Sequence, residues 1–152
     1  MTQPQPATKA QLYPEILYSG KLGCGPNCGN WPAKTGDECT FCPERNNEHP
    51  VSKTLWPDGE TTPLPLEPSL KLRGYSLTGF WWGGDVLGAS QLALALLYDA
   101  TGDPDKAGQF YYDFKIQVVS EFDREWVIFR STILDWLELM EARDIRERQG
   151  KN

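Results

Sequence analysis

Four cysteines in two close pairs are the strongest chemical signal in this sequence of 152 residues. Three residues separate Cys24 from Cys28, two separate Cys39 from Cys42, and ten lie between the pairs. Each pair sits at a turn that contains glycine or proline, so all four thiolates can converge on one tetrahedral ion. The spacing predicts a structural Zn²⁺ site, because four protein ligands leave no open position for water. Two disulfides or free thiols are the alternative.

The metal site would stabilise a segment that has no other means of folding. Residues 23–50 are rich in glycine, proline and asparagine and show neither a helical nor an alternating apolar pattern. The free energy of zinc binding would therefore fold this segment. His49, the single histidine, could replace one cysteine as a ligand, or it could be a solvated loop residue.

Other motifs that could support chemistry fail on spacing. The Cys24–Cys28 pair has one residue too many for a dithiol redox motif. Residues 29–35 carry the Lys-Thr of a phosphate loop, but Ala33 stands where a glycine is required. The turn at 83–85, Gly-Gly-Asp, is more typical of a capped helix start than of a phosphate site. No catalytic residue is predicted.

The charge balance and the N-terminal residues narrow the class of protein. Fifteen basic and 21 acidic residues give a net charge of −6, which argues against non-specific nucleic-acid binding. The first eleven residues lack the apolar core of a signal peptide, and no apolar run is long enough for a membrane span. We expect a cytoplasmic protein with no membrane association. In that reducing compartment, clustered cysteines favour metal over disulfides.

A buried helix is the centre of the predicted domain. Residues 79–100 run from an aromatic strand, Gly79–Trp82, through a glycine turn into a helix with no charge between Leu92 and Leu97. A helix that is apolar all round must be covered by other elements. Within the aromatic strand, side chains should alternate, so that Phe80 and Trp82 face the core and Trp81 faces away.

The flanking sequence predicts strands before this helix and helices after it. Residues 15–19 and 51–56 have strand character, and residues 57–60 are a predicted turn. The prolines in the following stretch, 61–66, allow only an edge strand or an extended arm there. Asp103 is the expected N-cap of a second helix, whose apolar positions are 107, 110, 111, 114, 118 and 122. A short strand at 126–129 precedes a third helix, capped by Ser131, with inward-facing positions 133, 134, 136, 137 and 140.

These elements predict one α+β domain: a small antiparallel sheet packed on about three helices, with a zinc-stapled loop insertion. The expected boundaries are a disordered tail at 1–12, the domain at 13–142 with the insertion at 23–50, and a charged tail at 143–152. The close acidic residues Glu121, Asp123 and Glu125 fit a solvated turn better than a general acid–base pair.

Residues 70–138 resemble an uncharacterised small domain family of bacteria, their phages and plasmids, with the signature G-F-x-W-G-Y-G-G-S-G-P-A-Q-L-A-L-A-L-L. The matching positions are Gly79, Phe80, Trp82, Gly83, Gly88, Gln91–Leu97, Asp113–Lys115, Val118, Val119 and Trp136. Tyr18-Ser-Gly20 resembles the strand with which that family opens. Gly84, Val86, Leu87 and Ala89 depart from the signature. The resemblance implies a fold and a mobile-element context, with no reaction attached.

We therefore expect a non-catalytic, zinc-stabilised protein-binding module, such as a phage or mobile-element inhibitor or modulator of a host protein. Trp81, Trp31 and Phe41 are the predicted partner-binding residues, because tryptophan is enriched at binding hot spots. Self-association through Trp81 is a second possibility. The alternative function is a nucleic-acid-associated zinc protein that contacts phosphates through Lys21, Lys34, Arg45 and Lys53.

Overall fold

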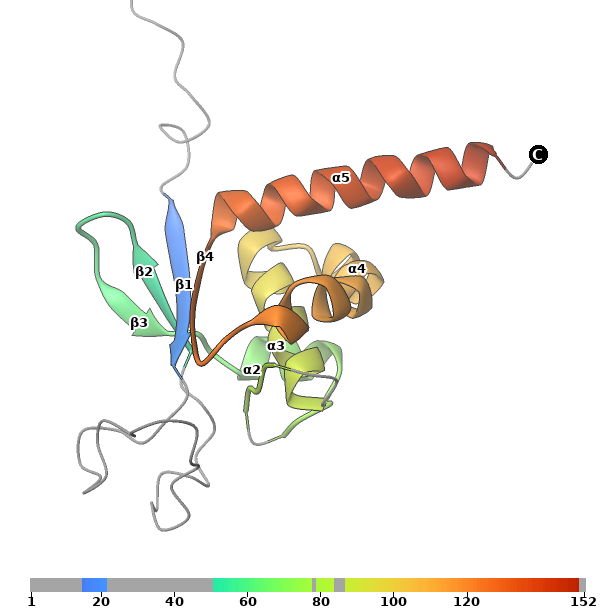
Figure 1. The fold of residues 1–152 in the computed structure, drawn as a ribbon. Helices are drawn as coiled ribbons and strands as arrows, with labels where there is room; N and C mark the ends of the chain where they lie inside the picture. The colour runs from blue at the N-terminus through green and yellow to red at the C-terminus, as the bar shows by residue number, and fades with distance from the viewer. Residues whose placement is uncertain (1–14, 22–50, 78, 84–86, 151–152) are drawn as a thin grey trace, which may run out of the picture.

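The computed structural model describes residues 15–21, 51–77, 79–83 and 87–150. Within these ranges the chain is a mixed α+β domain with a four-stranded antiparallel sheet of order β3-β2-β1-β4. The strands are β1 (Ile16–Lys21), β2 (Val51–Leu55), β3 (Thr61–Pro63) and β4 (Glu125–Phe129). Figure 1 shows the helices lying on one side of this sheet.

The described helices form the second layer of the domain. They are α2 (Glu67–Leu72), α3 (Leu87–Thr101), α4 (Pro104–Gln117) and α5 (Arg130–Gln149), with a short 3₁₀ helix, η2 (Val119–Glu121). Helix α3 is the buried centre that the sequence predicts, because all residues from Ala89 to Leu97 are buried. Helices α3 and α4 pack closely on each other, and α5 crosses beside them.

Alternating side chains give the sheet one covered and one open face. Tyr18, Gly20, Val51 and Trp126 face the helices and are buried. Their neighbours along the strands point to the other side, where Val127 has 66% of its surface exposed. This is the expected pattern of an antiparallel sheet with one face packed on helices.

Helix α4 begins as predicted. Asp103 accepts hydrogen bonds from the backbone N–H groups of Asp105 and Lys106, and Pro104 follows it at the first helical position. Phe110 and Phe114 are buried on the inner face.

The structure corrects the expectation that Gly79–Trp82 is a strand of the sheet. The alternation of side chains in this segment is as predicted, with Phe80 and Trp82 buried and Trp81 37% exposed, but the segment is not a strand of the sheet. The Trp82 indole donates to the carbonyl of Asp123 at 2.9 Å, and the Gly83 N–H bonds to Val119. Its contacts therefore go to the η2 region, and β4 takes the fourth place in the sheet.

The last helix also differs from the prediction at three positions. It begins at Arg130 with no side-chain cap from Ser131. Instead, the Ser131 N–H donates to the Glu15 carboxylate at 3.1 Å, so residue 15 caps this helix across the sheet. Leu134, expected in the core, is exposed. The helix also continues through Gln149, into the stretch expected to be a charged tail. Ion pairs four residues apart, Arg143–Glu147 and Arg148–Asp144, support this last part.

Helix α2 was not predicted, because the sequence between the expected edge strand and the aromatic segment shows no regular pattern. Six residues are too few for a clear apolar period, and Pro68 lies in the first turn. The helix depends on a tertiary contact: the Gln91 amide of α3 donates to the Ser69 hydroxyl, which in turn donates to Leu66.

Candidate interaction site at the end of the sheet

The two ends of the cysteine-bearing segment lie side by side at one end of the sheet. Gly20 near the end of β1 is directly opposite Val51 at the start of β2. Residues 22–50 therefore leave and rejoin the domain at adjacent positions of two paired strands. The described pairing of β1 with β2 runs from Ile16–Leu55 to Gly20–Val51, on the domain side of this junction.

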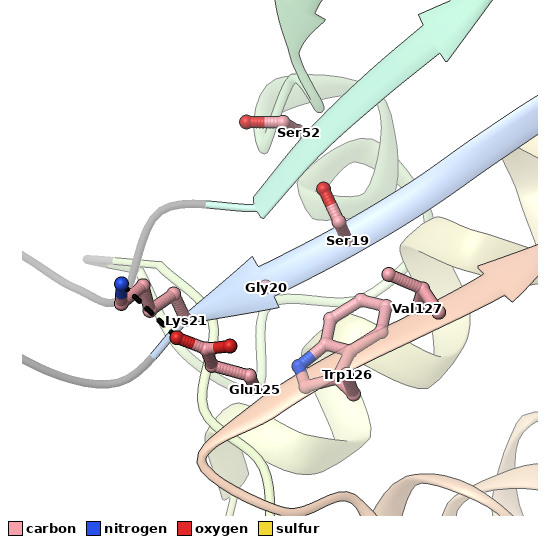
Figure 2. A pocket seen from close by; sticks show the side chains of 7 residues that line it. All are labelled: Ser19, Gly20, Lys21, Ser52, Glu125, Trp126 and Val127. Carbon is pink, nitrogen blue, oxygen red and sulfur yellow. Dashed lines mark ion pairs between the residues drawn. The ribbon is translucent and has the colours of Figure 1, made fainter. Parts of the chain in front are cut away.

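A surface depression lies beside this junction (Figure 2). Its volume is about 520 Å³, and it opens between strands β1, β2 and β4. The lining residues are Ser19, Gly20, Lys21, Ser52, Glu125, Trp126 and Val127. Hydroxyls, one ion pair and one exposed valine give it a mixed polar and apolar character, which suits a protein surface better than a small apolar ligand.

A tryptophan packed on a glycine forms the base of this region. A Cβ atom at Gly20 would lie only 2.4 Å from Nε1 of Trp126, so a side chain cannot be accommodated there without movement of the indole. The Trp126 ring stacks on Phe122 at 4.2 Å between centroids and meets Trp82 edge-on at 5.6 Å. These contacts hold β4 against η2 and the aromatic segment.

The indole N–H of Trp126 is buried and has no hydrogen-bond partner among the described residues. An unsatisfied buried donor costs about 1–3 kcal/mol. Among the described residues, the Trp126 indole is held by its ring contacts with Phe122 and Trp82. These contacts offset the free-energy cost of its unbonded N–H.

The charged rim of the depression is a weak ion pair. Lys21 Nζ lies 3.0 Å from the Glu125 carboxylate, and the two side chains are 51% and 68% exposed. Exposed pairs of this kind contribute less than about 1 kcal/mol. This ion pair therefore adds little to the stability of the fold.

A partly buried polar network joins the sheet to α3. The Tyr18 hydroxyl donates to Asp99 at 2.6 Å, and Lys53 Nζ lies 2.8 Å from the other carboxylate oxygen. Burial raises the pKa of Tyr18 well above its ordinary value, and the hydrogen bond to Asp99 and the nearby carboxylate charge raise it further. A cavity of about 250 Å³ beside Asp99 is lined by Leu64, Pro65, Pro68, Ser69, Ala95, Tyr98 and Gly102.

A second network is held by Gln91. Its side-chain oxygen accepts the N–H groups of Tyr75 at 2.7 Å and Ser76 at 3.1 Å. This places the Tyr75 hydroxyl against that of Tyr111, with the Arg73 guanidinium 3.2 Å away. Burial acts to raise the pKa of Tyr75, but the hydrogen bonds with Tyr111 and Arg73 together outweigh it and lower that pKa.

The predicted metal ligands and two of the predicted partner-binding residues lie outside the described residues. These are Cys24, Cys28, Cys39 and Cys42, with Trp31 and Phe41. Within the described ranges, no three His, Cys, Asp or Glu side chains gather as a metal site would require. Trp81 is described and partly exposed, and its backbone and Cβ pack against Gly88 at the start of α3.

Sequence reasoning missed the polar residues that connect the layers. Tyr18, Lys53 and Asp99 come from three distant parts of the chain, and only the fold brings them together. One signal was present: Gln91 and Asp99 are polar positions in a helix whose other residues are largely apolar. A buried polar side chain in such a helix needs partners, and both residues have them.

The described part of the protein is thus an α+β domain with a four-stranded antiparallel sheet that is covered by helices on one face. The chain belongs to a family of unknown function, DUF6166, whose model matches residues 44–139. The match runs from just before β2 into α5, so the four cysteines and β1 precede it. No curated protein and no solved structure matches the chain. Each described helix is too short or too polar to span a membrane.

Proposed function

We propose that the protein is a non-catalytic protein-binding module that contacts its partner through the zinc-stabilised segment 22–50 and the adjoining end of the sheet. One observation carries this proposal: the segment joins two neighbouring, paired strands beside a depression of about 520 Å³. The insertion can therefore vary in sequence without disturbing the core. Cys24, Cys28, Cys39 and Cys42 would hold one structural Zn²⁺, and Trp31 and Phe41 would be the contact residues.

An inhibitor or modulator of a host protein, encoded by a phage or similar mobile element, is the specific role we propose. It would act in the cytoplasm, where reduced cysteines stay available for zinc. A structural metal supplies a rigid loop, and rigid loops bind with a smaller loss of conformational entropy.

The nucleic-acid alternative has less support. Of the four basic residues that would contact phosphates, Lys21 is paired with Glu125 and Lys53 with Asp99. A phosphate contact would have to break both pairs. Salt-dependent binding to DNA or RNA, weakening steeply as salt rises, would favour this alternative over a protein partner.

The experiment compares the full chain with a variant in which a short Asn-Gly turn replaces residues 22–50. We expect the full chain, purified under reducing conditions without chelator, to contain about one zinc per molecule. The variant should lose the zinc and the ability to bind the purified partner, while its far-ultraviolet spectrum and unfolding transition stay those of a folded domain.

A second variant of full length tests the role of the four metal ligands separately from the deletion of residues 22–50. Serine at all four cysteine positions should remove zinc and partner binding without shortening the chain. A full chain without metal would refute the zinc site. Unimpaired partner binding by the shortened variant would refute the insertion as the contact surface.

A further inference from the structure

The two edges of the sheet are protected to different degrees. Strand β3 has only three residues and ends at Pro63, which has no N–H to offer to another strand. Strand β4, at the opposite edge, has the sequence Glu-Trp-Val-Ile-Phe, without proline or glycine. Natural proteins usually blunt such an edge with charge, proline or a covering element. Here the central residue of β4, Val127, is 66% exposed.

The hydrogen bonds of the sheet show which backbone groups of β4 point outward. The Trp56 N–H bonds to the Glu15 carbonyl, so alternate residues from Glu15 onward, including Ser19, turn their N–H and C=O groups toward β2. Tyr18 and Gly20 then turn theirs toward β4, where they face Ile128 and Trp126. Glu125 and Val127 consequently point their N–H and C=O groups away from the sheet. Phe129 points only its N–H outward, because it is the N-cap of α5 and its C=O belongs to the first turn of that helix. No described residue outside β4 hydrogen-bonds to the N–H or C=O of Val127.

We propose that β4 pairs with β4 of a second copy of this chain, antiparallel and centred on Val127, to give one continuous sheet across a two-fold axis. In this register Val127 faces its own counterpart, and Glu125 faces the partner's Phe129. The N–H and C=O of Val127 then bond to their counterparts in the second copy, and the C=O of Glu125 accepts from the N–H of the second copy's Phe129. The two glutamates lie at opposite ends of the pair, so no like charges meet.

The other edge determines that this assembly stops at two chains. A third chain would have to add to β3, and Pro63 and the following Pro65 remove the donors that it would need. The contact is thus isologous and closed. A strand from the N-terminal residues is a poorer occupant, because Pro4, Pro6 and Pro14 interrupt the available donors in that segment.

The test is the mass of the full chain in solution over a range of concentrations, together with amide hydrogen exchange. We expect the mass to double as concentration rises. The amides of Val127 and Phe129 should become protected with dimer formation, whereas those of Trp126 and Ile128, bonded to β1, should be protected at every concentration.

Two substitutions at one position test the edge directly. Val127→Lys should keep the chain monomeric at all concentrations, and Thr61→Lys, which adds the same charge to the outward edge of β3, should leave the dimer intact. Val127→Pro removes the outward N–H of this residue, at an edge strand where proline is tolerated, and should also give a monomer. A wild-type chain that stays monomeric at the highest concentration overturns the proposal, as does a Val127→Lys variant that still dimerises.

These outcomes are independent of the proposed function. Partner binding is measured through segment 22–50, and the dimer is measured in the chain alone. If the full chain is monomeric and the variant without residues 22–50 fails to bind the partner, the proposed function stands and the proposed dimer is refuted.

Discussion

The Tyr18 hydroxyl and the Asp99 carboxylate, 2.6 Å apart, connect the central strand β1 to the buried helix α3. Lys53 on β2 contacts the same carboxylate, so one acidic side chain joins two strands to a helix. Hydrogen bonds to charged groups contribute about 1.5–3 kcal/mol each when they are sheltered from water. This network is therefore a main polar contact between the two layers.

The first prediction concerns the stability of the protein at high pH. Because the pKa of Tyr18 is raised in the folded state, the folded protein keeps a proton that the unfolded chain loses above about pH 10. Stability from this group is full below that pH and declines above it, by up to about 1.4 kcal/mol per pH unit. Denaturant melts between pH 9 and 11 should show this extra decline in the wild type and not in Tyr18→Phe. If the free energy of unfolding declines equally with pH in the wild type and in Tyr18→Phe, the prediction is wrong.

The second prediction compares two glycine-to-alanine substitutions. Gly20→Ala forces a methyl group against Trp126 and should cost about 1–3 kcal/mol, with a change in tryptophan fluorescence. Gly108→Ala, within helix α4, meets no atom within 4 Å and should stabilise the protein by about 0.5–1 kcal/mol. Chemical denaturation measures both. Equal effects in the same direction would show that the Gly20–Trp126 contact is not tight.

The third prediction concerns Gln91. Gln91→Leu leaves the N–H groups of Tyr75 and Ser76 and the hydroxyl of Ser69 with one partner fewer, and it should destabilise the domain by about 2–4 kcal/mol. The amides of residues 75 and 76 should exchange much faster in the variant, while those in the middle of α4 keep their protection. Unchanged exchange at residues 75 and 76 would mean that other groups hold this turn.

The fourth prediction separates the two neighbouring tryptophans. Trp82→Ala should cost about 3–5 kcal/mol, because Trp82 is fully buried. Trp81→Glu should cost far less, because its ring is partly exposed, and it should weaken partner binding or self-association if Trp81 is an interface residue. Should Trp81→Glu unfold the domain, Trp81 belongs to the core and the contact surface must lie elsewhere.

Elements whose signal is local could be predicted from the sequence. An apolar run without charge identifies α3 as buried, and Asp103 with Pro104 marks the start of α4, because caps and periodicity depend on neighbours along the chain. The alternation at residues 80–82 and the prolines after β3 are local in the same way.

Contacts between residues far apart in the sequence could be learned only from the fold. It placed β4 in the sheet in place of residues 79–82, let Glu15 cap α5, and brought Tyr18, Lys53 and Asp99 together. The alternation of hydrogen bonds across β1 also determines which backbone groups of β4 point away from the sheet. The reason is physical: strand pairing and buried polar contacts gain their energy from groups that approach each other only after the chain has folded, so no local pattern encodes them.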